Sequence, residues 1–208
     1  MFAVIFEVKP KQERWNDYLD LAKQLRPKLE AIDGFIDNER FGSKQTEGLV
    51  LSLSTWRDEK SVVRWRTHGE HHGVQEKGRT AVFENYHLRV GEIVADSAPP
   101  IPVEEQRLDA TAVGAAKFCT ITEISPNHTI PSLDPRANGL LEYELFESIT
   151  NPGKLLILAA WRDKPAADGW KPTPSGDIRH REVRIIRDYG MFDRREAPQF
   201  YPDVMKPT

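Results

Sequence analysis

The sequence is poor in cysteine, lacks long apolar runs and carries no excess of positive charge. One cysteine among 208 residues, Cys119, excludes an internal disulfide and favours a reducing cytoplasm. No apolar run is long enough to span a membrane. The net charge of −3 argues against nucleic acid as a partner. The apolar N-terminus has no preceding basic residues and no small-residue cleavage site, so it predicts a β-strand, and no signal peptide.

Aromatic residues are plentiful, and they argue against a disordered chain. The sequence has nine Phe, five Trp and five Tyr, although 29% of its residues are charged. Such a composition can still bury an apolar core. The length allows one domain or two.

An internal repeat resolves that choice. Residues 34–65 and 139–170 align without a gap at an offset of 105 residues, with eleven identities in 32 positions. Two tryptophans and a Trp-Arg-Asp run fall in register at Trp56 and Trp161. Chance would give about two identities, so the repeat indicates a duplication. We also align 83–86 with 186–189.

Each copy is expected to contain a βαββαβ unit, a ferredoxin-like arrangement. The first copy predicts strands at 2–8, 35–42, 49–56 and 84–94, and helices at 12–33, 59–67 and 70–81. Pro27 should kink or split the first helix. In the second copy, prolines erode both helical segments. The expected domains are a pocket-bearing unit at 1–95, a linker at 96–112, a degenerate unit at 113–195 and a tail at 196–208.

The strand at 49–56 differs between the copies on one face. Ser52 and Ser54 lie on the face that carries Ile157 and Ala159 in the second copy. A buried hydroxyl needs a hydrogen-bond partner. The two serines are therefore candidates to line a partly polar cavity, the alternative being that this face is simply nearer solvent.

Residues 51–90 resemble the antibiotic biosynthesis monooxygenase superfamily of dimeric α/β barrels. The resemblance rests on a strand ending in Trp-Arg-Asp, a helix with Trp65, His68 and His71 soon after it, and a final strand starting near Tyr86. It implies an α+β fold in which the antiparallel sheets of two ferredoxin-like units pack into a barrel. The duplication implies an intrachain pseudo-dimer, and the resemblance leaves a further homodimer open.

The same resemblance implies a pocket lined by Trp65. Haem-degrading members carry an asparagine on the first strand and a histidine ten residues after this tryptophan. This sequence has Phe6 or Glu7, and Gln75, at those places. Haem degradation in the usual manner is therefore disfavoured, and we expect no cofactor. Trp65 is assigned a catalytic role, and Ser52, Ser54, His68, Gln75 and Tyr86 are assigned to substrate binding.

Three histidines near Trp65 allow several interpretations. His71 and His72 are candidate general bases, because an imidazole can take up a proton near neutral pH. His68 and His72 could chelate a divalent metal if both lay on one helix, but Gly69 argues for a break between them. The third interpretation is that they are polar residues at the start of a helix. We assign no metal site.

Three functions remain open at this stage. The first is cofactor-independent oxidation of an electron-rich aromatic or enolic small molecule around Trp65. The second is binding of haem or another small ligand without turnover. The third is a structural barrel protein without activity. A small-molecule partner follows from the first two.

Overall fold

The computed structural model describes residues 1–173 and 175–206, and it contains eight strands and four α-helices. Residues 207–208 of the predicted tail lie outside the described residues. The first half contains β1 (Phe2–Pro10), α1 (Trp15–Glu30), β2 (Phe35–Ser43), β3 (Val50–Trp56), α2 (Glu59–Arg66), α3 (Gly69–Lys77) and β4 (Phe83–Asp96). Short helical turns at Gln12–Arg14 and Gly78–Val82 flank α1 and α3. The second half contains β5 (Phe118–Ile124), β6 (Leu140–Ser148), β7 (Leu155–Trp161), α4 (Lys164–Asp168) and β8 (Ile178–Gly190).

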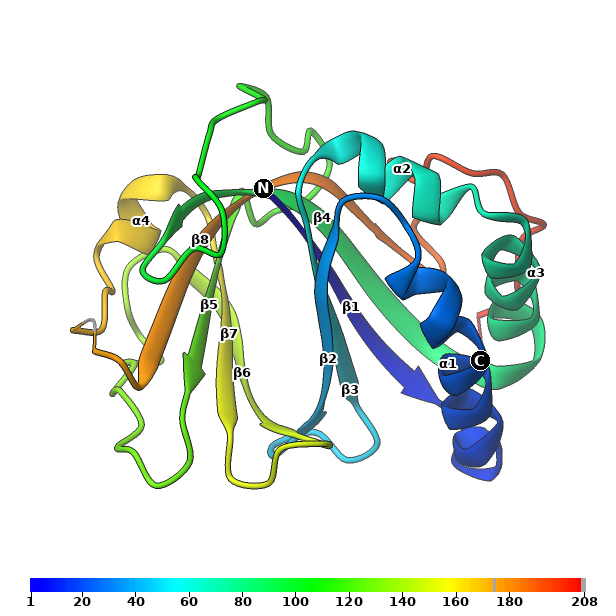
Figure 1. Ribbon diagram of the computed structural model, residues 1–208, viewed down its shortest axis with the longest axis horizontal. Coiled ribbons are helices and arrows are strands. Elements are labelled where there is room, and N and C mark those ends of the chain that lie inside the picture. Colours follow the sequence, from blue (N-terminus) through cyan, green and yellow to red (C-terminus); the bar gives the residue numbers. More distant parts are fainter. Residues whose placement is uncertain (174, 207–208) are drawn as a thin grey trace.

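The eight strands form one closed antiparallel barrel in the order β1-β3-β2-β6-β7-β5-β8-β4. Each half supplies four neighbouring strands, so one chain builds both sides of the barrel (Figure 1). The two seams between the halves differ. β4 and β8 pair from His87 to Asp96, whereas β2 and β6 pair over only three residues, Phe41 to Ser43. The predicted α+β barrel of two ferredoxin-like units is confirmed.

The barrel interior is filled by alternate residues of each strand, as the period of two in a β-strand requires. Ile5, Leu51 and Leu53 from the first half meet Ile121 and Leu158 from the second in one buried cluster. Cys119 belongs to the same cluster and is fully buried. The opposite face of each strand points outward, and three helices cover that face in the first half (Figure 1).

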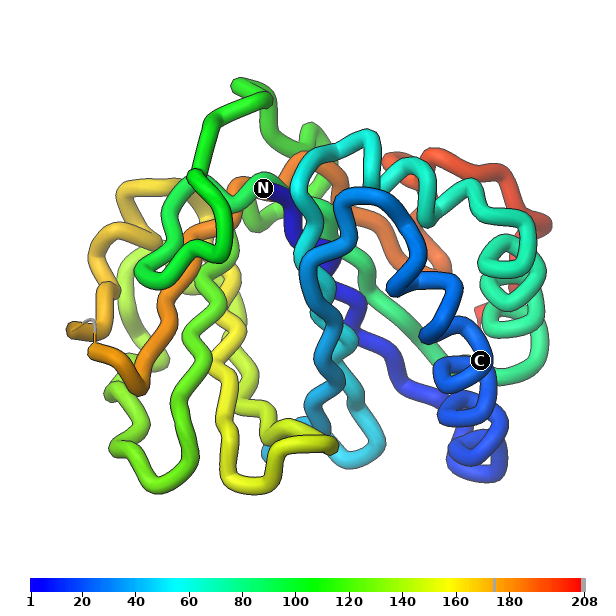
Figure 2. Tube along the Cα trace, viewed as in Figure 1, coloured from blue at the N-terminus to red at the C-terminus, as the bar shows by residue number. Residues whose placement is uncertain are grey.

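The helices are unequally divided between the halves. α1, α2 and α3 lie over the outer face of β1 to β4, and the segment after β8 returns to the same side (Figures 1 and 2). Among the described residues of the second half, the five-residue α4 is the only helix. Its outer face is covered instead by Leu133, Ala137 and Trp170, which pack against the cluster around Trp161. The predicted loss of helices in the second copy is confirmed.

Two sequence expectations need correction. Of the two effects predicted for Pro27, a split does not occur, since α1 continues from Trp15 to Glu30, whereas a kink stays a prediction. A proline removes one hydrogen bond to the preceding turn. Pro27 lies in the last turn of α1, where the helix ends three residues later.

The second correction concerns the last strand of each copy. Val8 pairs with Val50, and Ile124 pairs with Leu155, which matches Val50 at the 105-residue offset, so Val8 and Ile124 are equivalent. Tyr86 pairs with Val8, whereas Ile178 pairs with Ile124. Tyr86 therefore corresponds to Ile178 in space, and our alignment of 83–86 with 186–189 is wrong. Short, similar segments on long strands can be aligned in a register that the sheet does not use.

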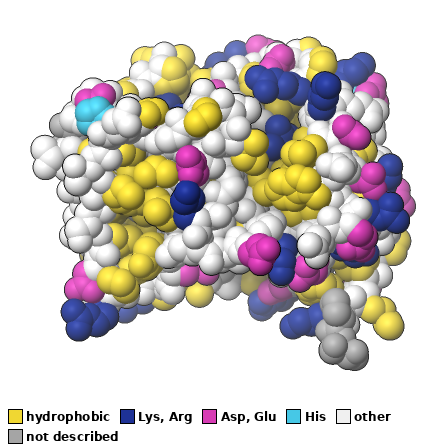
Figure 3. Space-filling view, turned by 90° about the horizontal axis from the view of Figure 1, so that it is seen from below, with side chains coloured by type: hydrophobic (Ala, Val, Ile, Leu, Met, Phe, Trp, Pro, Cys, Tyr) yellow, Lys and Arg dark blue, Asp and Glu magenta, His cyan; other side chains and the backbone are white. Residues whose placement is uncertain are grey.

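No helix in the described ranges is long and apolar enough to cross a bilayer. Figure 3 shows the molecule from the end at which the β2–β3 and β6–β7 hairpins turn. Apolar side chains lie there in separate patches between charged ones.

Candidate functional site

A cavity of about 190 Å³ lies between the helices of the first half and the outer face of its sheet. Its floor consists of rows of residues that pair across the strands. One row runs from Arg40 on β2 through Ser52 and Phe6 to Leu88 on β4. Its roof comes mainly from apolar residues on α1, α2 and α3. The cavity therefore combines an apolar body with a few polar groups, the usual character of a small-molecule site.

The two predicted serines lie on this floor, and both have hydrogen-bond partners. The Ser52 hydroxyl accepts from Asn38 at 3.1 Å, and the Ser54 hydroxyl accepts from the Trp56 indole at 2.9 Å. Asn38 also donates to the main-chain carbonyl of Leu53. Each hydroxyl still has its own proton to donate to a neighbour in the cavity.

His71 lies in the roof and is held by Trp65. The two rings stack with centroids 4.1 Å apart, and His71 Nδ1 lies 2.9 Å from the Trp65 carbonyl oxygen. A carbonyl only accepts, so Nδ1 carries the proton and Nε2 keeps a free lone pair. Burial lowers the pKa of His71 to about 4, aided by His68 and His72 and opposed by the bond to Trp65. His71 is therefore neutral near neutral pH.

Tyr86 reaches the cavity from β4 with two cationic donors on its hydroxyl. Arg79 and Arg194 each donate to the Tyr86 oxygen at 2.7 Å. Two accepted hydrogen bonds occupy both lone pairs, so the phenolic proton is free for an oxygen in the cavity. Guanidinium donors also draw charge from the phenol, which makes it a stronger hydrogen-bond donor.

The segment after β8 closes one side of the cavity. The Tyr201 hydroxyl lies 2.7 Å from the Gln75 side-chain oxygen and 3.0 Å from His72 Nδ1, and the Tyr201 ring stacks on His72. Gln199 donates to the Arg66 carbonyl at 2.9 Å. This segment therefore ties α2 and α3 to the second half of the chain.

The structure brings together most of the residues that the sequence singled out. Six of them line the cavity: Ser52, Ser54, Trp65, His71, Gln75 and Tyr86. His68 precedes α3 as its N-terminal flanking residue, and neither it nor His72 is among the lining residues. His72 is exposed and contacts the cavity only through Tyr201. Its predicted role as a general base stays a prediction.

Sequence reasoning missed the arginines and the segment after β8. Within the described part of the chain, no Asp or Glu lines the cavity, whereas five arginines do: Arg26, Arg40, Arg66, Arg79 and Arg194. Tyr18, Tyr189, Gln199 and Tyr201 also line it. Arg40 could have been found by comparing the copies, because Leu145 stands at its place in the second. Nothing local in the sequence indicates that Gln199 and Tyr201 fold back.

The cavity residues do not fit haem in the manner of the haem-degrading branch. Phe6 points into the cavity, so an apolar ring stands where that branch has asparagine. Gln75 stands at the histidine position, and its amide oxygen lies within hydrogen-bond distance of Gln199 and Tyr201. An amide is a poor iron ligand compared with imidazole. We therefore derive no step through haem.

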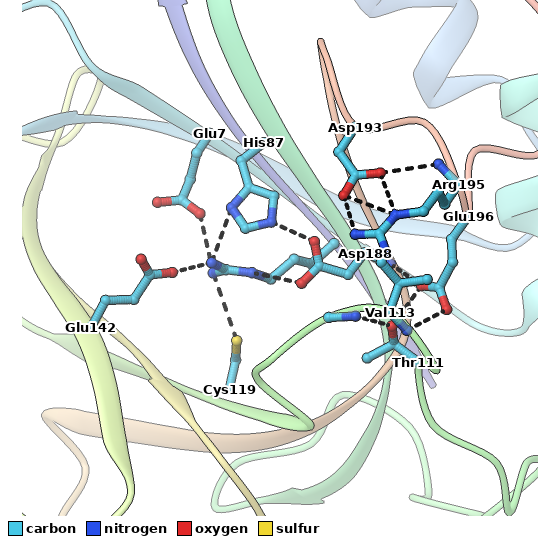
Figure 4. Close-up of polar contacts among 12 residues, drawn as sticks. Glu7, His87, Thr111, Val113, Cys119, Glu142, Asp188, Asp193, Arg195 and Glu196 are labelled. Carbon is cyan, nitrogen blue, oxygen red and sulfur yellow. Dashed lines mark hydrogen bonds and ion pairs between the residues drawn. The ribbon is translucent and has the colours of Figure 1, made fainter.

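A second polar cluster surrounds Arg89 at the β4–β8 seam. Glu7, His87, Glu142 and Asp188 all point toward its guanidinium (Figure 4). His87 Nε2 lies 2.5 Å from Asp188, and Arg89 donates to His87 Nδ1 at 3.0 Å. Both ring nitrogens of His87 are occupied, so this histidine cannot act as a base. The cluster joins strands from both halves and is structural.

Fold and cavity together define a class of protein: a single-chain α/β barrel with a small-molecule cavity under the helices of one half. The antibiotic biosynthesis monooxygenase family matches residues 1–77 and 135–175. Those ranges cover parts of both halves, and this chain belongs to that family.

The comparisons include one relative of nearly the same length. The chain is 44% identical over 218 residues to the jasmonate monooxygenase ABM of Pyricularia oryzae, covering 97% of this chain and 99% of that protein. It is 29% identical over 92 residues to the uncharacterized protein YqjZ of Bacillus subtilis, covering 44% of this chain and 78% of that protein. The solved structure of an anthrone oxidase-like protein is 9% identical, with 95% and 96% of the chains covered and a TM-score of 0.39.

Proposed function

We propose that this protein is a monooxygenase that oxidises a small molecule with an acidic C–H or O–H group in the cavity beside Trp65. His71 carries the proposal. It is a neutral imidazole whose Nδ1 proton is committed to the Trp65 carbonyl, and its ring lines an apolar cavity with Nε2 free. A base in this state can accept a proton from a bound substrate.

The proposed chemistry starts with proton removal from an enolisable ketone or a phenol. Tyr86 donates its phenolic proton to the substrate oxygen, and His71 Nε2 accepts the substrate proton. A pKa of about 4 makes His71 a weak base, since each pKa unit is worth ~1.4 kcal/mol. Proton transfer therefore depends on stabilising the substrate anion. The Tyr86 hydroxyl, with Arg79 and Arg194 behind it, is placed to do this.

The anion then reacts with O2. For a CH2 group that becomes a carbonyl, one oxygen atom enters the product and the other leaves as water. The substrate supplies all four electrons in that case, so no reductant is needed. The apolar walls of the cavity limit water, which would otherwise compete for the proton.

The relative in Pyricularia oryzae suggests jasmonate as the substrate to test first. Jasmonate contains an enolisable cyclopentanone, which fits the proposed proton removal. Hydroxylation of an unactivated carbon would differ, because it requires two electrons from an external reductant. The reductant requirement therefore separates the two reactions.

The test is oxygen uptake with jasmonate, an anthrone and a hydroquinone, each with and without NADPH. We expect uptake without reductant for at least one substrate, with one atom of ¹⁸O2 in the product. His71→Gln should lower kcat about 100-fold or more. His128→Gln, in an exposed loop of the second half, is the matched control and should keep wild-type activity.

Three results would change the proposal. Uptake only with NADPH would replace proton abstraction by a reductant-dependent hydroxylation. A greater loss in His72→Gln than in His71→Gln would move the base to His72. Tight binding without turnover would favour the ligand-binding alternative, and a Soret band on haemin titration would identify haem as that ligand.

The remaining assignments are also proposals. We propose the domain limits 1–95 and 113–195; the grouping of β1 to β4 and β5 to β8 supports them, although β4 runs one residue further, to Asp96. We also propose a cytoplasmic location. The buried thiol of Cys119 supports this location, because proteins of a reducing compartment are stable without disulfide bonds.

A further inference from the structure

Among the five cavity arginines, three already have partners. Arg26 pairs with Glu30 at 2.7 Å, and Arg79 and Arg194 share the Tyr86 hydroxyl. Arg79 and Arg194 also donate to main-chain carbonyls. The charge and donors of these three side chains are therefore largely committed to the fold.

Arg40 and Arg66 remain. Each has a buried Nε atom that finds no hydrogen-bond partner among the described residues, and neither forms an ion pair with a carboxylate there. A partly buried guanidinium without an acceptor is costly. These two side chains therefore offer unused donors and positive charge to whatever enters the cavity.

Tyr18 distinguishes the Arg40 end. It projects from α1 into the cavity, is only 5% exposed, and its hydroxyl has no partner among the described residues. Burial raises the pKa of Tyr18, and the nearby Arg40 guanidinium opposes that rise. The phenol therefore stays neutral near neutral pH and keeps a proton to donate. Arg40 from the floor and Tyr18 from the roof lie next to each other, and both the Tyr18 hydroxyl proton and the Arg40 Nε–H lack an acceptor among the described residues.

The second half shows that the barrel does not need an arginine at the position of Arg40. Arg40 and Ser52 are neighbours on β2 and β3, and their counterparts Leu145 and Ile157 are neighbours on β6 and β7. An apolar pair thus satisfies the same sheet position. The presence of Arg40 is therefore explained by the cavity beside it. In the second half, Leu133, Ala137 and Trp170 fill the corresponding space.

We infer that the cavity binds its substrate through a carboxylate, held by the Arg40 guanidinium and the Tyr18 hydroxyl, with the apolar remainder lying over Phe6 toward Trp65. The inference rests on the proposed function, because it assigns a subsite of the same cavity. A guanidinium fork matches the two oxygens of a carboxylate. None of the described residues that line the cavity is a lysine, which could match the higher charge of a phosphate.

The subsite also sets the direction of the substrate. Arg40 lies on β2 and Tyr86 on β4, with β3 and β1 between them. A carboxylate at Arg40 therefore places the apolar body over Phe6, beneath Trp65, and the Phe6 ring lies 5.6 Å from the Tyr86 ring, so a substrate oxygen there can meet the Tyr86 hydroxyl. Arg40 and Tyr18 bind and orient the substrate, and the proton transfer remains with His71.

The test compares jasmonate with its methyl ester, which keeps the shape and removes the charge. Binding to the full chain is followed by calorimetry, and turnover by oxygen uptake. We expect the acid to bind at least tenfold more tightly than the ester. Arg40→Gln should weaken binding of the acid about tenfold or more and change ester binding less than twofold. Tyr18→Phe should show the same selectivity with a smaller loss.

Two further variants separate binding from folding. Arg40→Lys keeps the charge and should recover part of the affinity for the acid. Arg64→Gln, at an exposed site on α2, is the matched control and should bind both molecules as the wild type does. Equal losses for acid and ester in Arg40→Gln would mean a packing role and overturn the inference.

The remaining outcomes separate this inference from the proposed function. If the ester binds and is oxidised as well as the acid, the monooxygenase proposal stands and the carboxylate subsite is wrong. If the acid binds selectively through Arg40 but is never oxidised, the subsite stands and the proposed reaction is wrong. If neither molecule binds, both fail for this substrate class.

Discussion

At the scale of single residues, the site depends on which ring nitrogens and hydroxyls are already engaged. His71 and His87 each have a hydrogen bond at Nδ1, but only His71 keeps a free Nε2. The sequence places both near the cavity-bearing strands and cannot separate them. The difference arises from Asp188, which reaches His87 from the neighbouring strand β8, and from Arg89, which lies two residues further along β4.

His71 should make stability depend on pH. Its folded pKa of about 4 lies below the ordinary value of 6.5, so the unfolded chain binds more protons between these limits. The contribution of His71 is therefore fully present above pH 6.5 and is lost as the pH falls to 4. Two to three pKa units correspond to about 3 kcal/mol. Urea unfolding at several pH values should show this loss.

A variant isolates that contribution from other groups. His71→Gln should remove the slope between pH 6.5 and 4, whereas His128→Gln should keep it. An unchanged slope in His71→Gln would mean that other groups cause the acid sensitivity.

Cys119 should be unreactive in the folded protein. Complete burial raises the pKa of its thiol to about 12, with Arg89 nearby opposing the rise. Almost no thiolate exists near neutral pH, and reagents cannot reach the sulfur. We expect a thiol-reactive dye to label the native chain at the rate of global unfolding. Rapid, complete labelling without denaturant would contradict this.

At the scale of elements, the sequence predicted the features of the duplication that depend on residues close together in the chain. Asp58 and Asp163 each cap the helix that follows, accepting from the main-chain N–H three residues later. These Asp residues were visible in the aligned segments. The β4–β8 register was not, because it depends on pairing between residues far apart in the chain. The extent of α1 past Pro27 likewise depends on what α1 packs against.

Gly34 and Gly139 should be needed at equivalent turns. Both have positive φ, at +88° and +79°, and a Cβ there would lie 2.0 Å from Ser61 Oγ or 2.5 Å from Ala166 Cβ. Strain and overlap together should cost Gly34→Ala about 2–4 kcal/mol. Thermal melting should show a matching loss for Gly139→Ala. Gly42→Ala is the control, because nothing lies within 4 Å of its Cβ.

At the scale of the whole molecule, barrel closure relies on side chains where main-chain pairing is short. Three residues pair between β2 and β6. Glu39 on β2 reinforces this seam by accepting from Ser148 at 2.6 Å, Asn151 at 2.7 Å and Lys154 at 2.5 Å. The sequence predicted two units in a barrel, but it could not show that one seam is long and the other short.

Glu39 should therefore stabilise the closed barrel. Burial alone would raise its pKa, but hydrogen bonds from Lys154, Ser148 and Asn151 outweigh burial and lower it. The folded chain thus favours the charged form, and this contribution is lost as the pH falls below the ordinary carboxyl range. Glu39→Gln should cost about 2 kcal/mol at neutral pH. Glu13→Gln, at an exposed site, should cost little in the same denaturant titration.

The filled outer face of the second half has a consequence for binding stoichiometry. In a barrel of two identical chains, every substitution appears on both sides, and two equal sites can influence each other. In this chain, Leu133, Ala137 and Trp170 fill the space that would hold a ligand in the second half. A substitution in one half leaves the sequence of the other half unaltered. A titration should saturate at one equivalent per chain with a Hill coefficient of one. If the proposed site is the only one, the fusion gives up the cooperativity open to a symmetric pair, and only the first half carries the reaction.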